Sequence, residues 1–482
     1  MKQLEKITPL EKDFAQWYTD VVTNGNLMNY GPAKGTIIYK PNSYGIWENI
    51  QKTLNEVFKK HGVENIYAPL FIPESLFKIE KEHVQGFNPE LATVTQVGNK
   101  KLSEKLIVRP TSEVIFANLF KEDINSYNDL PKIYNQWANV VRWEKVTKPF
   151  LRTREFLWQE GHTSHSSAEE ARSFTVKMIK EYEKFLKNYL AIPVVSGKKT
   201  CNEKFAGAVS TYTVEAMMKD GKALQAGTSH YLGQKFSRPY GISFKNKNNE
   251  EDFVYQTSWG VSTRLLGAII MVHGDNRGVI IPPKIAPIKV DILEILADKN
   301  PEVSKVANKI YKELSKKLSV RLDASNKSPG FKASQSEIEG VPLRIEVGPR
   351  DLENNCVTFV RRDTLEKTKV DLENVKKEVN NYLKLIQNNL YQAAKQRLKE
   401  NTVYAYNYED FKKHIADNKF VVVPFCCVTK KEIEIKEETG ATPRCILKKV
   451  KPRGVKLECV CKSDGCCDDD KAIKYVVFAR AY

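Results

Sequence analysis

The spacing of apolar positions predicts helices and strands in the first part of the chain. From Ser43 to Lys60, large apolar side chains recur every three or four residues, and Gly62 can end the predicted helix. The next apolar run, 65–71, reads as a strand that contains Pro69. Because proline has no backbone N–H, we expect this strand at a sheet edge, where subunits can meet. An ordinary place in the core is the alternative.

A strand-to-helix corner and a capped helix follow. An apolar strand turns at Thr111 and Glu113 into a helix predicted over 114–120. Side-chain oxygens at such a corner cap the helix, and that role is compatible with ligand binding. Ser167 and Glu170 have the spacing of a capping box and predict a long amphipathic helix after them.

The pattern changes near residue 288, after a cluster of prolines. Strands and helices then alternate over little more than a hundred residues, which is typical of a small domain with a mixed sheet. The predicted strands are 288–294, 319–323, 343–347 and 356–361, and the predicted helices are 301–318 and 371–399. Charged residues suited to reading base edges and phosphates gather at the strand ends: Arg344, Glu346, Arg350, Arg361 and Arg362.

The stretch 139–162 combines many charges with an aromatic, strand-like pattern. Two predicted strands there are joined by a Lys/Thr/Pro loop and carry Arg142 and Arg152. Fixed guanidinium groups over a sheet bind polyphosphates, whereas unpaired charge among aromatic side chains is costly. Arg264 opens another predicted helix, 265–272, and a ligand phosphate is one candidate for its partner. These arginines predict an anion site, with a solvated hairpin as the alternative.

Composition favours a polyanionic partner. The 482 residues include 76 Lys and Arg against 59 Asp and Glu, which gives a net charge of +17 and a pI near 9.2. Such a surplus suggests nucleic acid first and an anionic membrane second. A lysine-rich proteome is the alternative explanation.

Nothing in the sequence indicates secretion or membrane insertion. The start, MKQLEKITPLEKDF, lacks the apolar core of a secretory signal. No apolar run approaches the roughly 18 residues of a membrane span. We therefore expect a cytoplasmic protein without a membrane partner. Its nine cysteines, seven of them after residue 425, are then expected as metal ligands or inert thiols rather than disulfides.

Three segments resemble, in order, the signature motifs of the class II aminoacyl-tRNA synthetases. GVENIYAP at 62–69 resembles motif 1, VVRWE and FLRTREFLWQEGHT within 140–163 resemble motif 2, and SWGVSTRLLG with VHGDNRG within 258–278 resembles motif 3. RPTSE, KFAGA, QAGTSH and VGPRD are further marks. In detail the chain looks like the prolyl-tRNA synthetases of the archaeal/eukaryotic type, which lack an editing insertion.

The resemblance implies an α+β chain of three domains. Residues 1–283 would form the class II catalytic domain around an antiparallel sheet, 284–400 an α/β anticodon-binding domain, and 401–482 a small α/β C-terminal domain of the zinc-binding type. The implied partners are L-proline, tRNA(Pro) and a second copy of the chain, bound through motif 1. The implied reaction is activation of proline by ATP with Mg²⁺, followed by transfer to the 3′ end of the tRNA.

The resemblance also implies roles for single residues. Arg142 and Arg264 would be catalytic, with Arg142 between the α-phosphate of ATP and the proline carboxylate, and Phe156 and Arg264 on the two faces of the adenine. The implied ATP-binding residues are Arg142, Glu144, Arg152, Phe156, Gln225, Thr228, Ser262 and Arg264. The implied proline-binding residues are Thr111, Glu113, Arg142, Trp158, Glu160, His162, Phe205 and His230. The implied anticodon-binding residues are Arg344, Glu346, Arg350 and Arg361.

The C-terminal segment departs from the zinc-binding pattern. Cys426, Cys459 and Cys461 match three ligands, but Lys431 stands where the family has its second cysteine. Another cysteine can substitute, since zinc takes four soft ligands at about 2.3 Å; loss of zinc is the alternative. For the whole chain, the alternatives are a synthetase for threonine or histidine, which TSE, WQEGHT and GTSH disfavour, and a non-catalytic tRNA-binding paralogue, which the intact arginines disfavour.

Overall fold

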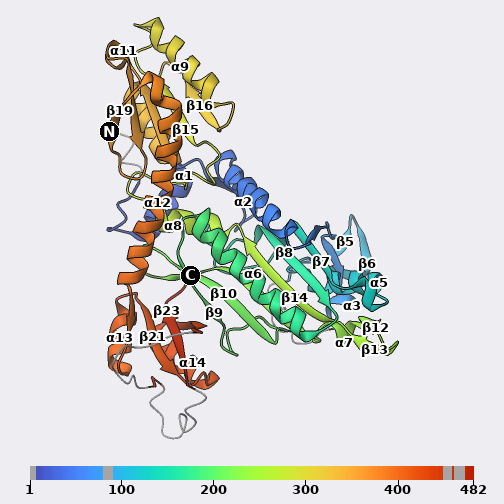
Figure 1. The fold of residues 1–482 in the computed structure, drawn as a ribbon. Coiled ribbons are helices and arrows are strands. Elements are labelled where there is room, and N and C mark those ends of the chain that lie inside the picture. The colour runs from blue at the N-terminus through green and yellow to red at the C-terminus, as the bar shows by residue number, and fades with distance from the viewer. Residues whose placement is uncertain (1–6, 80–90, 449–458, 461–472) are drawn as a thin grey trace.

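The computed structural model of the chain describes residues 7–79, 91–448, 459–460 and 473–482. Figure 1 shows the long helix α12 (Val375–Glu400) running from an α/β region at one end of the molecule to the C-terminal strands at the other. The largest sheet extends to one side of this helix. Within the described ranges, no helix is both long and apolar enough to cross a membrane.

The arginine-rich hairpin, β7 and β8, lies near one edge of the largest sheet, where only β3 is beyond it. Its eleven strands follow the order β20-β21-β23-β22-β9-β10-β11-β14-β8-β7-β3. From β9 to β7 every neighbouring pair is antiparallel, which confirms the predicted fold class. The bounds of these strands are β3 Glu64–Asn65, β7 Lys132–Val141, β8 Glu155–His165, β9 Val194–Lys198, β10 Ser210–Met217, β11 Ala223–Gly233 and β14 Tyr255–Ser262.

Helices α2, α6 and α8 share one hydrophobic core with this sheet. Within the core, the buried Trp259 ring lies 6.0 Å from Phe58 on α2 and 5.4 Å from Phe174 on α6. Ser167 Oγ accepts the backbone N–H of Glu170 at 3.2 Å and so begins α6, as the capping pattern predicts. The bounds are α2 Pro41–Lys59, α6 Ala168–Asn188 and α8 Arg264–His273.

The proline-containing run after α2 does not form one continuous strand. It is divided between β3, at an edge of the large sheet, and β4, in a separate sheet of order β4-β6-β5. The buried guanidinium of Arg109 satisfies the backbone between them, donating to Ala68 O at 2.7 Å and to Pro69 O at 3.2 Å. This side chain therefore replaces the strand pairing that the sequence predicts. The bounds here are β4 Phe71–Pro73, β5 Thr93–Val97, β6 Lys100–Val108 and α5 Glu113–Asp123.

The connection between β8 and β14 is compact. It contains one long helix, the three strands β9 to β11, a short helix and a small hairpin. This agrees with the resemblance to synthetases that lack an editing insertion. The small elements of the N-terminal part and of this connection are α1 Phe14–Asn24, β1 Met28–Tyr30, β2 Ile37–Tyr39, α3 Glu74–Phe77, η3 Tyr127–Asp129, α7 Ser237–Tyr240, β12 Ser243–Lys245 and β13 Glu251–Phe253.

Residues 290–400 form the predicted mixed sheet, in the order β16-β15-β17-β18-β19. The sequence does not predict helix α10, which starts at the Ser328 cap and Pro329 and ends at Gly340 with a φ of 77°. It also does not predict the edge strand β19. The bounds are β15 Val290–Glu294, β16 Val320–Asp323, β17 Leu343–Val347, β18 Cys356–Arg361, β19 Lys367–Asp371, α9 Pro301–Leu314, α10 Pro329–Glu339, α11 Pro349–Glu353 and η4 Leu372–Asn374.

The C-terminal strands continue the large sheet instead of forming a sheet of their own. Strand β22 lies beside β9, with Ile446 opposite Lys198, so it covers what would be an open edge of the central strands. A buried ion pair crosses the same junction, where Arg444 Nη2 donates to Glu215 Oε2 at 2.9 Å. The bounds are β20 Thr402–Tyr404, β21 Phe420–Phe425, β22 Thr442–Ile446, β23 Lys474–Ala479, α13 Tyr408–Ala416 and α14 Thr429–Thr439.

The last residue of α8, His273, makes the stability of the protein sensitive to acid. Its buried Nε2 donates to Leu190 O at 2.8 Å. Burial lowers the pKa of His273 to about 3, whereas the unfolded chain binds a proton near pH 6.5. Between these values the unfolded state holds more protons, so the free energy of unfolding falls as the pH falls.

We therefore expect His273→Gln to flatten the loss of stability between about pH 6.5 and 4, by up to about 1.4 kcal/mol per pH unit. Urea unfolding at a series of pH values measures this slope. His61→Gln is the matched control, because His61 is partly exposed beside Glu181. A slope that His273→Gln leaves unchanged would contradict the prediction.

Candidate active site

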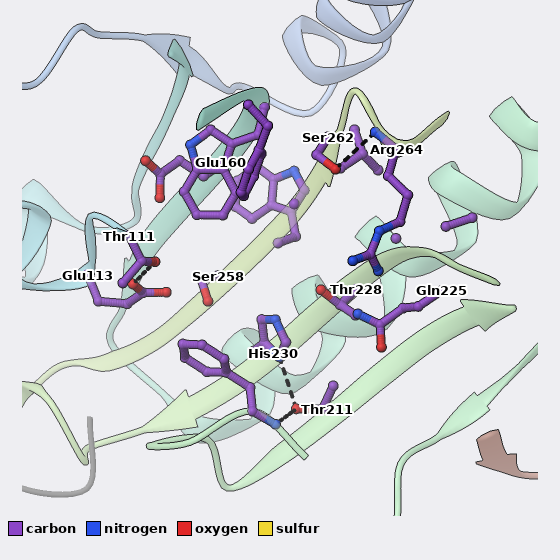
Figure 2. A pocket seen from close by; sticks show the side chains of 18 of the residues that line it. Thr111, Glu113, Glu160, Thr211, Gln225, Thr228, His230, Ser258, Ser262 and Arg264 are labelled. Atoms are coloured by element: carbon purple, nitrogen blue, oxygen red, sulfur yellow. Dashed lines mark hydrogen bonds between the residues drawn. The ribbon is translucent and has the colours of Figure 1, made fainter. Parts of the chain in front are cut away.

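One cavity of about 270 Å³ lies over the central strands of the large sheet. Side chains from β8, β11 and β14 and from the starts of α5 and α8 line it, and Figure 2 shows how they point towards a common space. It brings together most of the residues that the resemblance implies for the two small substrates. These are Thr111, Glu113, Arg142, Phe156, Trp158, Glu160, His162, Phe205, Gln225, Thr228, His230, Ser262 and Arg264.

A buried carboxylate stands at one end of the cavity. Glu113 is in the first turn of α5, and Thr111 Oγ1 donates a short hydrogen bond to its Oε2. The position at a helix N-terminus stabilises the negative charge. This end of the cavity therefore offers an anion to a small cationic group.

A second carboxylate, Glu160, lies deeper and is only 3% exposed. Ser112 Oγ donates to its Oε1 at 2.5 Å, and His162 Nε2 lies 3.0 Å from its Oε2. The His162 ring stacks on Phe116 with 4.1 Å between centroids. Packing on one face and the carboxylate on its edge hold this imidazole in a single orientation at the cavity wall.

His230 is kept neutral beside these carboxylates. Burial lowers the pKa of His230 to about 4, although the nearby Glu113 carboxylate opposes this effect. Thr211 Oγ1 accepts the backbone N–H of Phe205 at 3.0 Å and lies 2.9 Å from His230 Nδ1. In the tautomer in which the Thr211 hydroxyl donates to Nδ1, the imidazole hydrogen is on Nε2. His230 can thus donate a hydrogen bond without carrying a charge.

Arginines dominate the opposite end of the cavity. The Arg142 guanidinium lies 5.5 Å from the ring centroids of both Phe156 and Trp158, and its Nε donates to Pro110 O at 3.1 Å. Arg264 is half-buried at the end of the cavity away from Glu113, and desolvation together with the charges of Arg152 and Arg142 lowers its pKa to about 10. Cations that disfavour one another in a buried site are stabilised by a bound anion, so this end suits phosphate groups.

Two residues implied for ATP binding do not line the cavity. Glu144 and Arg152 form an ion pair with each other, with 3.4 Å between Arg152 Nη1 and Glu144 Oε2. The Arg152 side chain is 49% exposed. It lies on the loop between β7 and β8, close enough to Arg264 to lower its pKa. In this arrangement Arg152 is a cation beside the arginine end rather than part of the cavity wall.

Two of the four residues implied for anticodon binding line a common cavity, and the other two do not. A cavity of about 540 Å³ at the strand ends of the five-stranded sheet is lined by Glu346 and Arg350, with Lys367 and Lys369. Arg344 lies outside this cavity, 5% exposed and paired with carboxylates of α10 and β17. Arg361 is likewise outside it and donates to Asp363.

Arg362, which the sequence places with this group, has a different role. Its guanidinium donates to both carboxylate oxygens of Asp275, at 2.8 and 2.7 Å. It therefore joins the α/β region to the segment after α8 and is committed to that contact.

The described residues do not assemble a zinc site. Cys426 and Cys459 are described, whereas Cys461 lies outside the described residues. Among the residues that are described, no three His, Cys, Asp or Glu side chains are close enough together to hold a metal ion. Lys431, at the expected cysteine position, pairs with Glu434 at 2.6 Å. Burial raises the pKa of Cys427 to about 11.

Some cavity residues have no signal in the sequence. Glu203 and Thr211 line the cavity but lie outside the short words that carry the resemblance, and Ser258 lies within motif 3 without an implied role. Strand register places Thr211 and Ser258 opposite His230, on the two strands that flank β11. Spacing along the chain cannot show such cross-strand neighbours, because the sheet pairs strands that are distant in sequence.

Models of three known protein families match successive parts of the chain. A model of the tRNA synthetase class II core domain (G, H, P, S and T) matches residues 94–273. A model of an anticodon binding domain matches residues 279–382, and a model of the prolyl-tRNA synthetase C-terminal region matches residues 408–482.

Several curated proteins are similar over their whole length. A proline–tRNA ligase of Mycoplasmopsis synoviae (strain 53) is 99% identical over 482 residues, covering all of both chains. Proline–tRNA ligases of Mycoplasmopsis pulmonis and Mycoplasma mobile are 60% and 58% identical, again over the full length of both chains.

Proposed function

The chain belongs to the class II prolyl-tRNA synthetases and is a proline–tRNA ligase, and we propose that its two small substrates meet at Arg142. ATP activates proline to prolyl-adenylate with release of pyrophosphate, and the prolyl group then passes to the 3′ end of the tRNA. The proposal rests on one observation. A single cavity has the Glu113 side chain at one end and the Arg264 side chain at the other, and Arg142 also lines it.

Proline is bound at the carboxylate end in this proposal. Its secondary ammonium group is cationic and donates to the Glu113 carboxylate, while the neutral His230 ring adds no positive charge beside it. The ring lies among Trp158, His162 and Phe205, whose rigid faces leave little space for a larger side chain. Glu160 holds His162 in this wall, with 3.0 Å between Glu160 Oε2 and His162 Nε2.

ATP is bound at the arginine end. Arg264 and Phe156 take the adenine between a cation and an aromatic face, and Arg152 reaches the outer phosphates from its loop. Gln225, Thr228 and Ser262 present oxygen atoms on the same side of the cavity. Hard oxygen ligands of this kind suit Mg²⁺, so we assign Gln225 and Thr228 to the metal that accompanies ATP. Bound there, Mg²⁺ would neutralise phosphate charge.

No protein nucleophile is required. The proline carboxylate attacks the α-phosphorus, and the charge that develops there is stabilised by Arg142 and Arg264. Both side chains are fixed before substrate arrives, Arg142 by Pro110 O and Arg264 by Leu151 O at 3.2 Å. Catalysis is therefore positioning together with charge neutralisation.

The other proposed partners contact other parts of the chain. We assign residues 1–283 to catalysis, 284–400 to the anticodon and 401–482 to a C-terminal domain, and Glu346 and Arg350 to the anticodon bases. A homodimer would form through the motif 1 segment, where Tyr67 is 73% exposed. Zinc in the C-terminal domain has no support among the described residues, and no step is assigned to it.

Pyrophosphate exchange with each of the twenty amino acids in turn tests the proposal. We expect ATP to form from labelled pyrophosphate in the presence of proline, and not with threonine or histidine. The ratio of the exchange rates with proline and with alanine measures how closely Trp158, His162 and Phe205 fit the ring. Absence of exchange with proline would refute the assignment of this cavity.

A further inference from the structure

Gln136 is a buried amide beneath the proposed proline site. It lies on β7, opposite Glu160 of β8 in the strand register, and is 0% exposed. Its Nε2 donates to Glu160 Oε1 in a short hydrogen bond and to Ser112 Oγ at 2.8 Å. It does not line the cavity itself.

The orientation of this amide is determined by its second contact. Gln136 Oε1 accepts the backbone N–H of Ala68 at 3.0 Å. Because the oxygen faces Ala68, the amide nitrogen faces Glu160. Ala68 is fixed in turn, because its carbonyl oxygen accepts from the buried Arg109. The amide therefore has one orientation, in which its N–H groups face Glu160 and Ser112.

The contact between Gln136 and Glu160 affects the cavity because Glu160 also contacts His162, which lines the cavity. One carboxylate oxygen accepts from Gln136 and Ser112, and the other faces His162 Nε2 at 3.0 Å. Charge-assisted hydrogen bonds of this kind are short and directional. If the Gln136 donor is lost, the carboxylate can rotate, and the edge of His162 then loses its fixed partner.

We propose that Gln136 is a positioning residue for proline recognition. It holds Glu160, and through Glu160 the His162 face of the proline pocket, in the geometry that proline requires. This inference rests on the proposed proline site. Because Arg264, Gln225 and Thr228 are at the other end of the cavity, the effect of Gln136 is confined to the proline half.

The test is Gln136→Leu, which nearly keeps the volume of the side chain and removes all three of its hydrogen bonds. We expect the KM for proline in pyrophosphate exchange to rise about 10- to 100-fold, the usual effect of losing a hydrogen bond to a charged group. The KM for ATP should stay unchanged. The ratio of exchange rates with proline and alanine should also fall, because the pocket wall is no longer fixed.

Gln159→Leu is the matched control. Gln159 is an equally buried glutamine on the adjacent strand β8, and its side chain contacts Tyr182 of α6 instead of the cavity. This change should lower the midpoint of urea unfolding without a selective rise in the KM for proline. If Gln136→Leu raises both KM values together, as a general structural defect does, the inference is wrong.

Gln136→Glu adds a readout that depends on protonation. A neutral carboxyl group can still donate to Glu160 and accept from Ala68, whereas its ionised form places two negative charges together. We expect near-normal KM for proline at acidic pH and a steep rise as the pH increases, a dependence that the unaltered enzyme lacks. A KM for proline that neither variant changes would overturn the inference, provided that the unaltered chain exchanges pyrophosphate with proline. Failure of that exchange would instead overturn the proposed site.

Discussion

Arg142→Ala is expected to lower the rate of proline-dependent pyrophosphate exchange by at least about two orders of magnitude. Arg142 is proposed to contact both reacting groups, the α-phosphate and the carboxylate that attacks it. Its removal leaves the developing charge on phosphorus without its fixed donor. Binding of tRNA(Pro) should remain nearly intact, since the proposed anticodon contacts lie around Glu346 and Arg350, in a separate sheet.

Two further variants separate charge from geometry. Arg142→Lys keeps a cation but loses the planar fork that can bind phosphate and carboxylate together, so we expect an intermediate rate. Arg154→Ala is the matched control on the same hairpin. The Arg154 guanidinium lies 4.3 Å from the Trp143 ring, and its Nη1 donates to Lys34 O at 2.9 Å, so it is engaged away from the cavity. Its removal should leave the exchange rate largely unchanged.

The measurements are steady-state exchange and a filter-binding titration with tRNA. Loss of tRNA binding in Arg142→Ala at unchanged exchange would show that Arg142 has a structural role on the tRNA side. Equal losses in Arg142→Ala and Arg154→Ala would show that the whole hairpin had been disturbed. Either result would contradict the placement of Arg142 between the two substrates.

The elements that the sequence predicts well are those with a strong local signal. Helix α2 follows from regular apolar spacing, and α6 follows from the Ser167 cap, because both signals act within a few residues. The split of the run 65–71 depends instead on Arg109, whose side chain reaches Ala68 from 41 positions along the chain. A hydrogen bond between residues so far apart along the chain produces no periodic pattern in the sequence.

The candidate site likewise contains residues that have a local signal in the sequence and residues that depend on contacts between distant segments. Its arginines and Glu113 can be found because they lie in short words that resemble known motifs. Thr211 and Gln136 cannot, since each acts through a residue that only strand register brings opposite to it, His230 and Glu160 respectively. The joining of the C-terminal strands to the central sheet is equally hidden, because it depends on the edge that β9 leaves open.

Arg444→Met is expected to destabilise the folded protein by about 3 kcal/mol or more, because it removes one partner of a fully buried carboxylate. Glu215 is 0% exposed and is held by Arg444, by Lys199 at 3.1 Å and by Thr213 Oγ1 at 2.7 Å. Burial alone would raise the pKa of Glu215, but the charges of Lys199 and Arg444 outweigh it and keep the pKa below its ordinary value. Because Arg444 belongs to β22, the change also loosens the C-terminal strands from the central sheet.

The direction of the pH dependence follows from this lowered pKa. A carboxylate with a depressed pKa stabilises the folded state above its unfolded pKa, and the contribution is lost as the pH falls through the folded value. Without Arg444 the folded pKa of Glu215 rises, so this stabilisation becomes smaller. The difference in urea midpoint between the two proteins should therefore be largest near neutral pH and should narrow towards acid.

The double variant Arg444→Met with Glu215→Gln identifies the source of the loss. Since the amide carries no charge, the double variant should be more stable than Arg444→Met alone, and the cycle should give a coupling of about 1–3 kcal/mol. Arg480→Met is the matched control, as Arg480 is only partly buried and donates to Thr439 O at 3.1 Å. Glu215 also lies opposite Gln225 in the strand register, so the KM for ATP should rise in Arg444→Met and stay unchanged in Arg480→Met. If the two arginine variants lower the urea midpoint equally, the buried pair gives the junction no more stability than the partly buried Arg480 does.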